Sequence, residues 1–337
     1  MNIVVSRRAR VGPHGVRPAL FARLPVETTT SAPITKNTGR TPCGPTKIRP
    51  YFPAAAILLI VASFLTTTRC GSKKAEKVSA AGFNVVLITL DTMRADHIGA
   101  YGAASPATPN LDALARSGVR FDQAMSAVPL TLPSHATILS GLLPLHHGLR
   151  NNGAGSFPGD RDTLAAMFSR GGYRTGAFVG SFVLDHRFGL ERGFEVYDDQ
   201  IPRQPDTDHV MGVEAERPAD AVVDRALSWL DGQDVRPFFV WIHLYDAHAP
   251  YAAPEPFRSR YSDTPYDGEV AWVDSQVGRV FADLQKRGWT NRTIVVVVGD
   301  HGESLGEHGE LTHGLLLYQP TLRVPMIWSA PALAPPA

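Results

Sequence analysis

Cysteine is almost absent from this chain of 337 residues, which contains only Cys43 and Cys70. Both precede the region that we expect to fold, so the predicted fold holds neither a disulfide nor a cysteine-ligated metal. A dominant charge is also lacking, because 33 basic and 32 acidic residues leave a net charge of +1. This balance gives no reason to expect a nucleic-acid partner. There is no internal repeat, and the length suits one large α/β domain or two smaller ones.

Long hydrophobic runs are scarce, and the main one near the start is Ala54–Leu65. It is shorter than the roughly 20 residues of an ordinary membrane span but has the length of a signal-peptide core. Lys47 and Arg49 supply the positive charge expected in front of such a core. We therefore predict that residues 51–70 are a signal or anchor segment. The protein is then expected to be exported or membrane-associated, in the periplasm or cell envelope.

The flanking segments fit this interpretation. Residues 1–50 are rich in arginine, proline, threonine and glycine without periodicity, which predicts a disordered basic leader. A start codon placed too far upstream would explain its length. Cys70 would suit lipid attachment, although Arg69 stands where a small residue is expected. The charged linker at 71–82 argues against the alternative, in which the apolar run is a short buried helix.

Residues 83–330 alternate between patterns typical of strands and of helices. We expect strands at 84–90, 173–179, 237–243, 293–298 and 323–328, and helices at 109–118, 133–140, 161–170, 219–230 and 266–288. The continuous apolar runs at 84–90 and 293–298 indicate strands buried on both faces. The alternation predicts an α/β fold with a mostly parallel, mixed central sheet sandwiched between helices. Residues 195–216 are expected to form a polar surface excursion, and 331–337 a tail.

The stretch Pro129–Gly141 places a threonine at the start of a predicted helix. Pro133 suits the first helical position, and Gly141 suits the end. Thr131 would then lie just outside the helix, where free N–H groups and the positive end of the dipole favour an anion or alkoxide. That position suits a nucleophile that attacks a charged ester, and a cap or turn residue is the alternative.

Acidic residues follow two of the buried strands. Asp91 comes after residues 84–90, and Asp300 with His301 after residues 293–298. Open α/β sheets place their ligands at this end of the strands. Two carboxylates and an imidazole suit a divalent cation: calcium or magnesium if oxygen dominates, manganese or zinc if nitrogen counts. Such a metal would bind the Thr131 hydroxyl and lower its pKa. The alternative for each aspartate is that it caps a helix or lies in a turn.

Several histidines are candidates for stabilising a tetrahedral anion. These are His135, His248 and His313, each of which could also be an ordinary surface residue. Asp246 could serve a second metal together with His248 and His313.

Five groups of stretches in this order resemble the sulfatase family of the alkaline phosphatase superfamily. They are Asn84–His97 with Gly99–Gly102, Thr108–Asp112, Thr131–His135 with Leu139–Gly141, His243–Tyr251, and Gly299–Glu303 with Leu305–Gly309. The resemblance extends over residues 83–330 and implies an alkaline-phosphatase-like catalytic domain. It also implies that Asp91, Asp300 and His301 bind the metal, with Thr131 at the position of the nucleophile and His248 as an anion-binding histidine.

The chain departs from the family pattern at several positions. Family sulfatases carry C/S-x-P-S-R, and the Cys or Ser is oxidised to formylglycine. Thr131 occupies that place and His135 replaces the arginine. Threonine cannot become that aldehyde because its β-carbon carries a methyl group, so no formylglycine is expected. Thr92 stands where many members have a second metal-binding aspartate, and His313 where many have a lysine. The expected smaller C-terminal subdomain is missing, which suggests a fragment or a short member.

Three functions remain open at this point. The leading one is a metal-dependent hydrolase that cleaves a sulfate or phosphate ester through Thr131, using one calcium, manganese or zinc ion. The second is a phosphoryl-group transferase or phosphodiesterase at the membrane surface, and the third is a non-catalytic metal-binding member. The expected partner is an anionic ester on a small molecule, a glycan or a lipid head group, with possible membrane attachment through the N-terminal segment.

Overall fold

The computed structural model describes residues 80–105, 107–201, 216–232 and 234–333. The predicted leader, the apolar segment and residues 71–79 of the linker lie outside this part. Among the described residues, no helix has the length and apolar character needed to cross a membrane.

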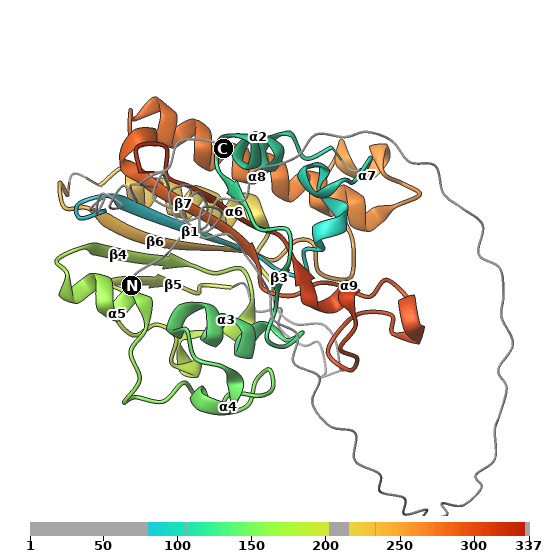
Figure 1. The fold of residues 1–337 in the computed structure, drawn as a ribbon, viewed down its shortest axis with the longest axis horizontal. Coiled ribbons are helices and arrows are strands. Elements are labelled where there is room, and N and C mark those ends of the chain that lie inside the picture. Colours follow the sequence, from blue (N-terminus) through green and yellow to red (C-terminus); the bar gives the residue numbers. More distant parts are fainter. Residues whose placement is uncertain (1–79, 106, 202–215, 233, 334–337) are drawn as a thin grey trace, which may run out of the picture. The chain divides into compact units, whose positions relative to one another are not determined.

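Seven strands form the central sheet. They are β1 (Asn84–Leu90), β2 (Val119–Arg120), β4 (Arg174–Phe178), β5 (Val196–Asp198), β6 (Phe238–Leu244), β7 (Thr293–Gly299) and β9 (Met326–Ser329). Their order is β2-β9-β7-β1-β6-β4-β5 (Figure 1). β9 runs antiparallel to β2 and β7, whereas the other pairs are parallel. The short strands β3 (Ala124–Met125) and β8 (Arg323–Val324) pair separately.

Helices cover both faces of this sheet (Figure 1). α2 (Pro109–Ser117), α6 (Ala219–Leu230) and α8 (Pro265–Lys286) pack in one core, and α3 (Thr131–Ser140) and α5 (Leu164–Arg170) in the other. The short helices are α4 (Pro144–His147), α7 (Phe257–Arg260) and α9 (Gln319–Leu322). Alternate side chains of the strands point to opposite layers. On β1, for example, Ile88 packs in the core formed with α2, α6 and α8, and Leu87 in the core formed with α3 and α5. The predicted α/β sandwich is therefore confirmed.

The register of the middle strands positions the candidate site. β1 lies between β6 and β7, with Leu90 opposite both Leu244 and Gly299. The next residues of β1 and β7 are Asp91 and Asp300, so the two carboxylates leave the sheet next to each other. Two residues earlier, Thr89 lies opposite His243 on β6. The carboxyl edge of three parallel strands therefore gathers the polar side chains, as expected for an open α/β sheet.

Some predicted boundaries were wrong for identifiable reasons. The helix expected at 161–170 begins at Leu164, because the Thr163 hydroxyl accepts a hydrogen bond from the Ala166 N–H and caps it. The strand expected at 323–328 divides at Pro325, where β8 pairs with β3 and β9 pairs with β7. Proline has no N–H to donate to a ladder, which favours such an interruption. Within the expected excursion 195–216, residues 196–198 form edge strand β5, and 202–215 lie outside the described residues.

Helix α3 begins earlier than predicted. Thr131 is its first residue rather than a residue outside it, because the Ser134 N–H already donates to the Leu130 carbonyl at 3.0 Å. The Leu132 N–H is bound by the Asn152 side chain at 2.9 Å, and Pro133 has no N–H. The helix start therefore offers an anion fewer free N–H groups than the sequence suggested.

Candidate active site

Asp91, Asp300 and His301 form a buried group at the carboxyl edge of the sheet. One ligand atom from each lies within 4.8 Å of the other two. Nε2 of His301 is 3.8 Å from Asp91 Oδ1 and 3.5 Å from Asp300 Oδ2. These two carboxylate oxygens are fully enclosed and have no hydrogen-bond partner among the described residues. Buried oxygens in this state call for a cation.

The remaining atoms of these side chains are fixed by the protein. Nδ1 of His301 donates to the Gly302 carbonyl at 3.0 Å, so the lone pair of the neutral ring lies on Nε2, toward the carboxylates. Asp300 Oδ1 accepts the N–H groups of Thr92 and His301. Asp91 Oδ2 accepts from Nε2 of His243 at 3.0 Å. The donor set fits a divalent cation, with outer hydrogen bonds that orient each ligand.

The pKa values of the two carboxyl groups are shifted in opposite directions. Burial and the negative charge of Asp91 raise the pKa of Asp300 well above its ordinary value. Burial also raises the pKa of Asp91, but the His243 hydrogen bond and the nearby His301 outweigh it and lower that pKa. Burial, with the charge of His313, lowers the pKa of His301 to about 3, so its ring is neutral and able to ligate. The raised pKa of Asp300 shows that two negative charges in this place are unfavourable unless a cation compensates them.

The Thr131 hydroxyl lies beside this group. Its side chain is buried, and it donates to Nε2 of His301 at 3.3 Å. The nucleophile predicted from the sequence and the predicted ligands thus meet at one place, although they come from α3, β1 and β7. A hydroxyl within reach of a metal-type group can become an activated nucleophile.

His135 is placed differently from the prediction, behind Thr131 rather than beside its hydroxyl. Its Nδ1 donates to the Thr131 carbonyl at 2.8 Å, and its Nε2 accepts from the Thr89 hydroxyl at 2.9 Å. The Thr89 oxygen in turn accepts the Trp241 indole N–H at 2.9 Å. Burial lowers the pKa of His135 to about 3, which keeps the ring neutral. Because both ring nitrogens are occupied, His135 supports the first turn of α3 and has no donor left for an anion.

His248 and His313 do approach the group. The centroid of the His313 ring lies 4.4 Å from that of His301 and 5.0 Å from that of His248. His313 Nδ1 lies 3.1 Å from the carboxylate of Glu303. Burial lowers the pKa of His313, but the Glu303 carboxylate outweighs it and raises that pKa above its ordinary value. His248 stacks on Tyr245 and donates from Nδ1 to the Ala249 carbonyl at 2.7 Å.

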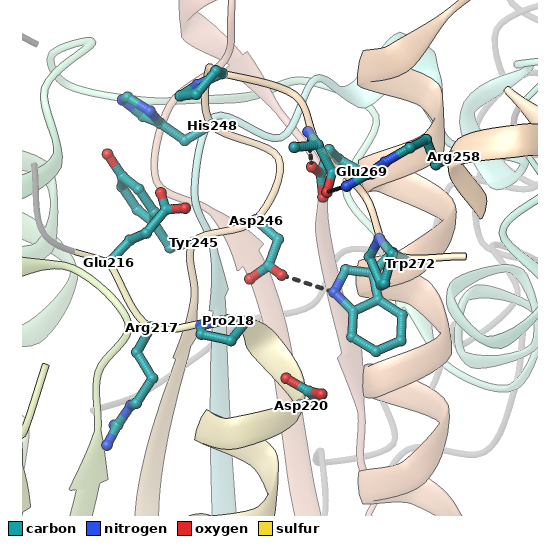
Figure 2. Close-up of a pocket in the computed structure, with 13 residues that line it drawn as sticks. Glu216, Arg217, Pro218, Asp220, Tyr245, Asp246, His248, Arg258, Glu269 and Trp272 are labelled. Carbon is teal, nitrogen blue, oxygen red and sulfur yellow. Dashed lines mark hydrogen bonds between the residues drawn. The ribbon is translucent and has the colours of Figure 1, made fainter. Parts of the chain in front are cut away.

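The predicted second metal site is not assembled. Within the described residues, Asp246 does not come close enough to His248 and His313 to join them in a ligand group. Its carboxylate instead accepts the Trp272 indole N–H at 2.7 Å, and Figure 2 shows it turned toward α8 and away from His248. The turn after β6 sends the two side chains in different directions.

Thr92 marks another departure from the family pattern. Its backbone is left-handed (φ 48°), which is unusual for a β-branched residue. Its hydroxyl is buried and makes no hydrogen bond with the described residues. The peptide is held on both sides, because the N–H donates to Asp300 and the carbonyl accepts from the Tyr266 hydroxyl at 2.8 Å. The strained residue therefore keeps Asp300 oriented.

Sequence reasoning missed the roles of His243, Thr89, Trp241 and Glu303. Their contacts depend on which residues of β1 and β6 lie opposite each other and on the path of the loop after β7. His243 occurs within a family-like stretch, and that was the signal that could have pointed to it.

A mostly parallel sheet between helices, with this group of side chains at the carboxyl edge of its strands, is typical of alkaline-phosphatase-like proteins. The Sulfatase family profile matches residues 83–336, and the chain belongs to the sulfatase family. This confirms the resemblance drawn from the sequence motifs.

Two curated relatives illustrate the range of similarity. The N-acetylgalactosamine-6-sulfatase of Rattus norvegicus is 30% identical over 269 residues, which cover 66% of this chain and 50% of the rat protein. The arylsulfatase of Clostridium perfringens is 25% identical over 324 residues, which cover 72% of this chain and 67% of the relative. The chain thus spans about half the length of the rat relative.

Solved structures share the fold. The phosphonate monoester hydrolase of Agrobacterium radiobacter matches with a TM-score of 0.63 at 22% identity, covering 74% of this chain and 68% of that one. A protein solved with its substrate D-glucosamine-2-N,6-O-disulfate matches with a TM-score of 0.64 at 20% identity, covering 74% and 71%. At these identities, the match shows the architecture alone.

Proposed function

We propose that this protein is a metal-dependent hydrolase that cleaves a sulfate or phosphate ester through Thr131. The observation that supports this most is the contact between the Thr131 hydroxyl and Nε2 of His301, beside the partnerless oxygens of Asp91 and Asp300. Asp91 Oδ1, Asp300 Oδ2, His301 Nε2 and the Thr131 hydroxyl would hold one calcium, manganese or zinc ion. Such an ion, when bound, acidifies the hydroxyl and stabilises negative charge.

The residues of the chain supply the remaining steps. The Thr131 oxygen attacks phosphorus or sulfur, a bond to the threonine forms, and the bond to the alcohol breaks. We assign His248 and His313 to donate to the anion from Nε2 in their protonated forms, and the raised pKa of His313 favours that form. The proton that the Thr131 hydroxyl gives up is matched by one that protonated His313 donates to the departing alcohol. Water then attacks the threonine ester, returns a proton to the Thr131 oxygen and releases the phosphate or sulfate. We assign His135 a positioning role, because its bond to the Thr131 carbonyl holds the start of α3.

The relatives' names suggest the kind of substrate. The rat relative is named for a sulfated aminosugar, and one structural neighbour was solved with a glucosamine disulfate. We propose an anionic ester carried by a small molecule, a glycan or a lipid head group. Export and attachment to the cell envelope remain predictions from residues 51–70. Threonine in place of the formylglycine precursor favours phosphorus chemistry, through a direct alkoxide.

A paired assay of the full chain tests this proposal. Purified protein with calcium, manganese or zinc is offered an aryl sulfate in one arm, and an aryl phosphate monoester and diester in the other. Thr131→Ala is the matched variant. Turnover of either ester class that is lost in the variant supports the threonine nucleophile. The arm in which turnover occurs identifies the class of ester that is cleaved. Metal binding without turnover in both arms would contradict hydrolysis and favour the non-catalytic alternative.

A further inference from the structure

A cavity of about 320 Å³ lies beside His248 and is lined by carboxylates. Its walls come from the residues that lead into α6, the loop that follows β6, and one face of α8 (Figure 2). Glu216, Asp220, Asp246 and Glu269 line it. None of these four takes part in the reaction proposed above.

The two arginines that also line this cavity are bound to other groups. Arg217 donates to Asp198 and to the Val179 carbonyl, both at 2.8 Å. Arg258 donates to the backbone carbonyls of two loop residues at 3.1 and 3.2 Å. Four carboxylates therefore face two guanidinium groups around this space. Nε of Arg217 has no hydrogen-bond partner among the described residues, and the exposed Arg258 partly offsets the raised pKa of Glu269.

Two of the carboxylates are enclosed. Asp246 Oδ2 is fully buried and has no hydrogen-bond partner among the described residues. Burial, together with Glu216 and Asp220, raises the pKa of Asp246 to about 6. Burial, together with Asp246 and Glu216, raises the pKa of Glu269 to about 8. Negative charge in this cavity is thus unfavourable unless a cation shares it.

We propose that the cavity binds the cationic end of a zwitterionic ester, an ammonium group on the alcohol whose sulfate or phosphate lies at Thr131. This inference rests on the proposed function and adds a class of substrate to it. His248 links the two places, because it lines the cavity and its ring packs on His313.

The spacing of the carboxylates favours an organic cation over a metal ion. Among the described residues, the cavity carboxylates do not form a group with ligand atoms within 4.8 Å of one another, as Asp91, Asp300 and His301 do. A chelated metal needs converging oxygens, whereas an ammonium group is stabilised by negative charge at several distances and by aromatic rings such as that of Trp272 in the cavity wall. The same carboxylates repel a second sulfate, so a polysulfated glycan fits this cavity poorly.

Equilibrium binding tests the cavity without any need for turnover. Isothermal titration of the full chain compares choline with its neutral isostere, in which carbon replaces nitrogen. We expect choline to bind at least about tenfold more tightly, the effect of one favourable charge interaction of moderate strength. Glu269→Gln and Asp246→Asn keep the shape of the side chain and should remove most of this preference. Asp283→Asn, on α8 outside the cavity, should retain it. Equal binding of both compounds by the unmodified protein would overturn the proposal.

The second part of this test measures turnover. Phosphocholine and choline sulfate are each compared with the ester of the neutral isostere, and kcat/KM is measured for the unmodified chain and for Glu269→Gln. We expect the cationic ester to be preferred and the ratio to approach unity in the variant. Turnover without this preference would overturn the cavity proposal alone. Cavity-dependent choline binding without turnover of any ester would contradict the hydrolase and leave the cavity supported.

Discussion

Nε2 of His301 lies 3.3 Å from the hydroxyl oxygen of Thr131, although 170 residues separate the two in the chain. The contact joins the first turn of α3 to the residue that follows Asp300. We predict that Thr131→Val, which keeps the shape but removes the hydroxyl, lowers kcat by at least about 10³-fold. Thr131→Ser keeps an attacking oxygen and should retain a measurable rate. Steady-state kinetics on the responsive ester check this, and an active valine variant would contradict the nucleophile.

The hydrogen-bond chain behind Thr131 supports a second prediction. Thr89→Val leaves Nε2 of His135 and the Trp241 indole without a partner in a buried place. We expect a loss of about 1–3 kcal/mol of unfolding free energy. We also expect kcat to fall about tenfold with little change in KM, because the attacking hydroxyl is displaced while the substrate contacts remain. Urea unfolding and kinetics measure the two effects.

Thr89→Ser is the control for that variant, because serine keeps the hydroxyl that joins the two rings. Recovery of both stability and kcat in the serine variant is expected. Equal damage by valine and serine would show that the methyl group, and not the hydrogen bond, matters.

Removal of the metal should destabilise the domain. Asp91 and Asp300 are buried together, and a bound cation compensates their repulsion. A ligand at about 100 times its Kd adds about 2.7 kcal/mol to the unfolding free energy. We therefore expect calcium, manganese or zinc to raise Tm, and a chelator to reverse the rise. Thermal scans across the three metals also identify the preferred ion.

The Asp300→Asn variant removes the charge of this side chain but keeps its hydrogen bonds to the loop. Asparagine can still accept the N–H groups of Thr92 and His301, so the loop remains supported. At pH 7, we expect the metal-free variant to be more stable than the metal-free parent, because it need not carry a buried carboxyl with a raised pKa. The metal-induced rise in Tm should largely vanish. A full rise in the variant would contradict Asp300 as a ligand.

The cavity carboxylates predict a pH dependence of stability. Burial raises the pKa of Glu269 from its ordinary 4.5 to about 8. Between these values the folded state binds more protons than the unfolded state, so its stability falls as pH rises. Glu269→Gln removes this dependence. The variant should match the parent below pH 4.5 and exceed it in Tm by at least about 3 °C above pH 8. Thermal unfolding at matched ionic strength checks this, and a constant difference across pH would refute it.

The sequence contained enough information to place the two aspartates side by side. Apolar runs that are buried on both faces indicate parallel strands, and Asp91 and Asp300 follow them directly. The contact between Asp91 and His243 was not predictable in the same way. It depends on the register between β1 and β6, and uniformly apolar strands carry little register information. The direction of Asp246 depends on a turn, where helix and strand periodicities give no guidance.

The sheet order also has a consequence for how the chain is made. β1, the middle strand, is synthesised early, but its two partners begin at Phe238 and Thr293. A nascent chain that ends before β7 therefore exposes an apolar strand with one edge unpaired and lacks two of the three clustered ligands. Such late, long-range pairing slows folding and leaves intermediates open to aggregation. The second edge of β1 can therefore be paired only after residues 293–299 have been synthesised.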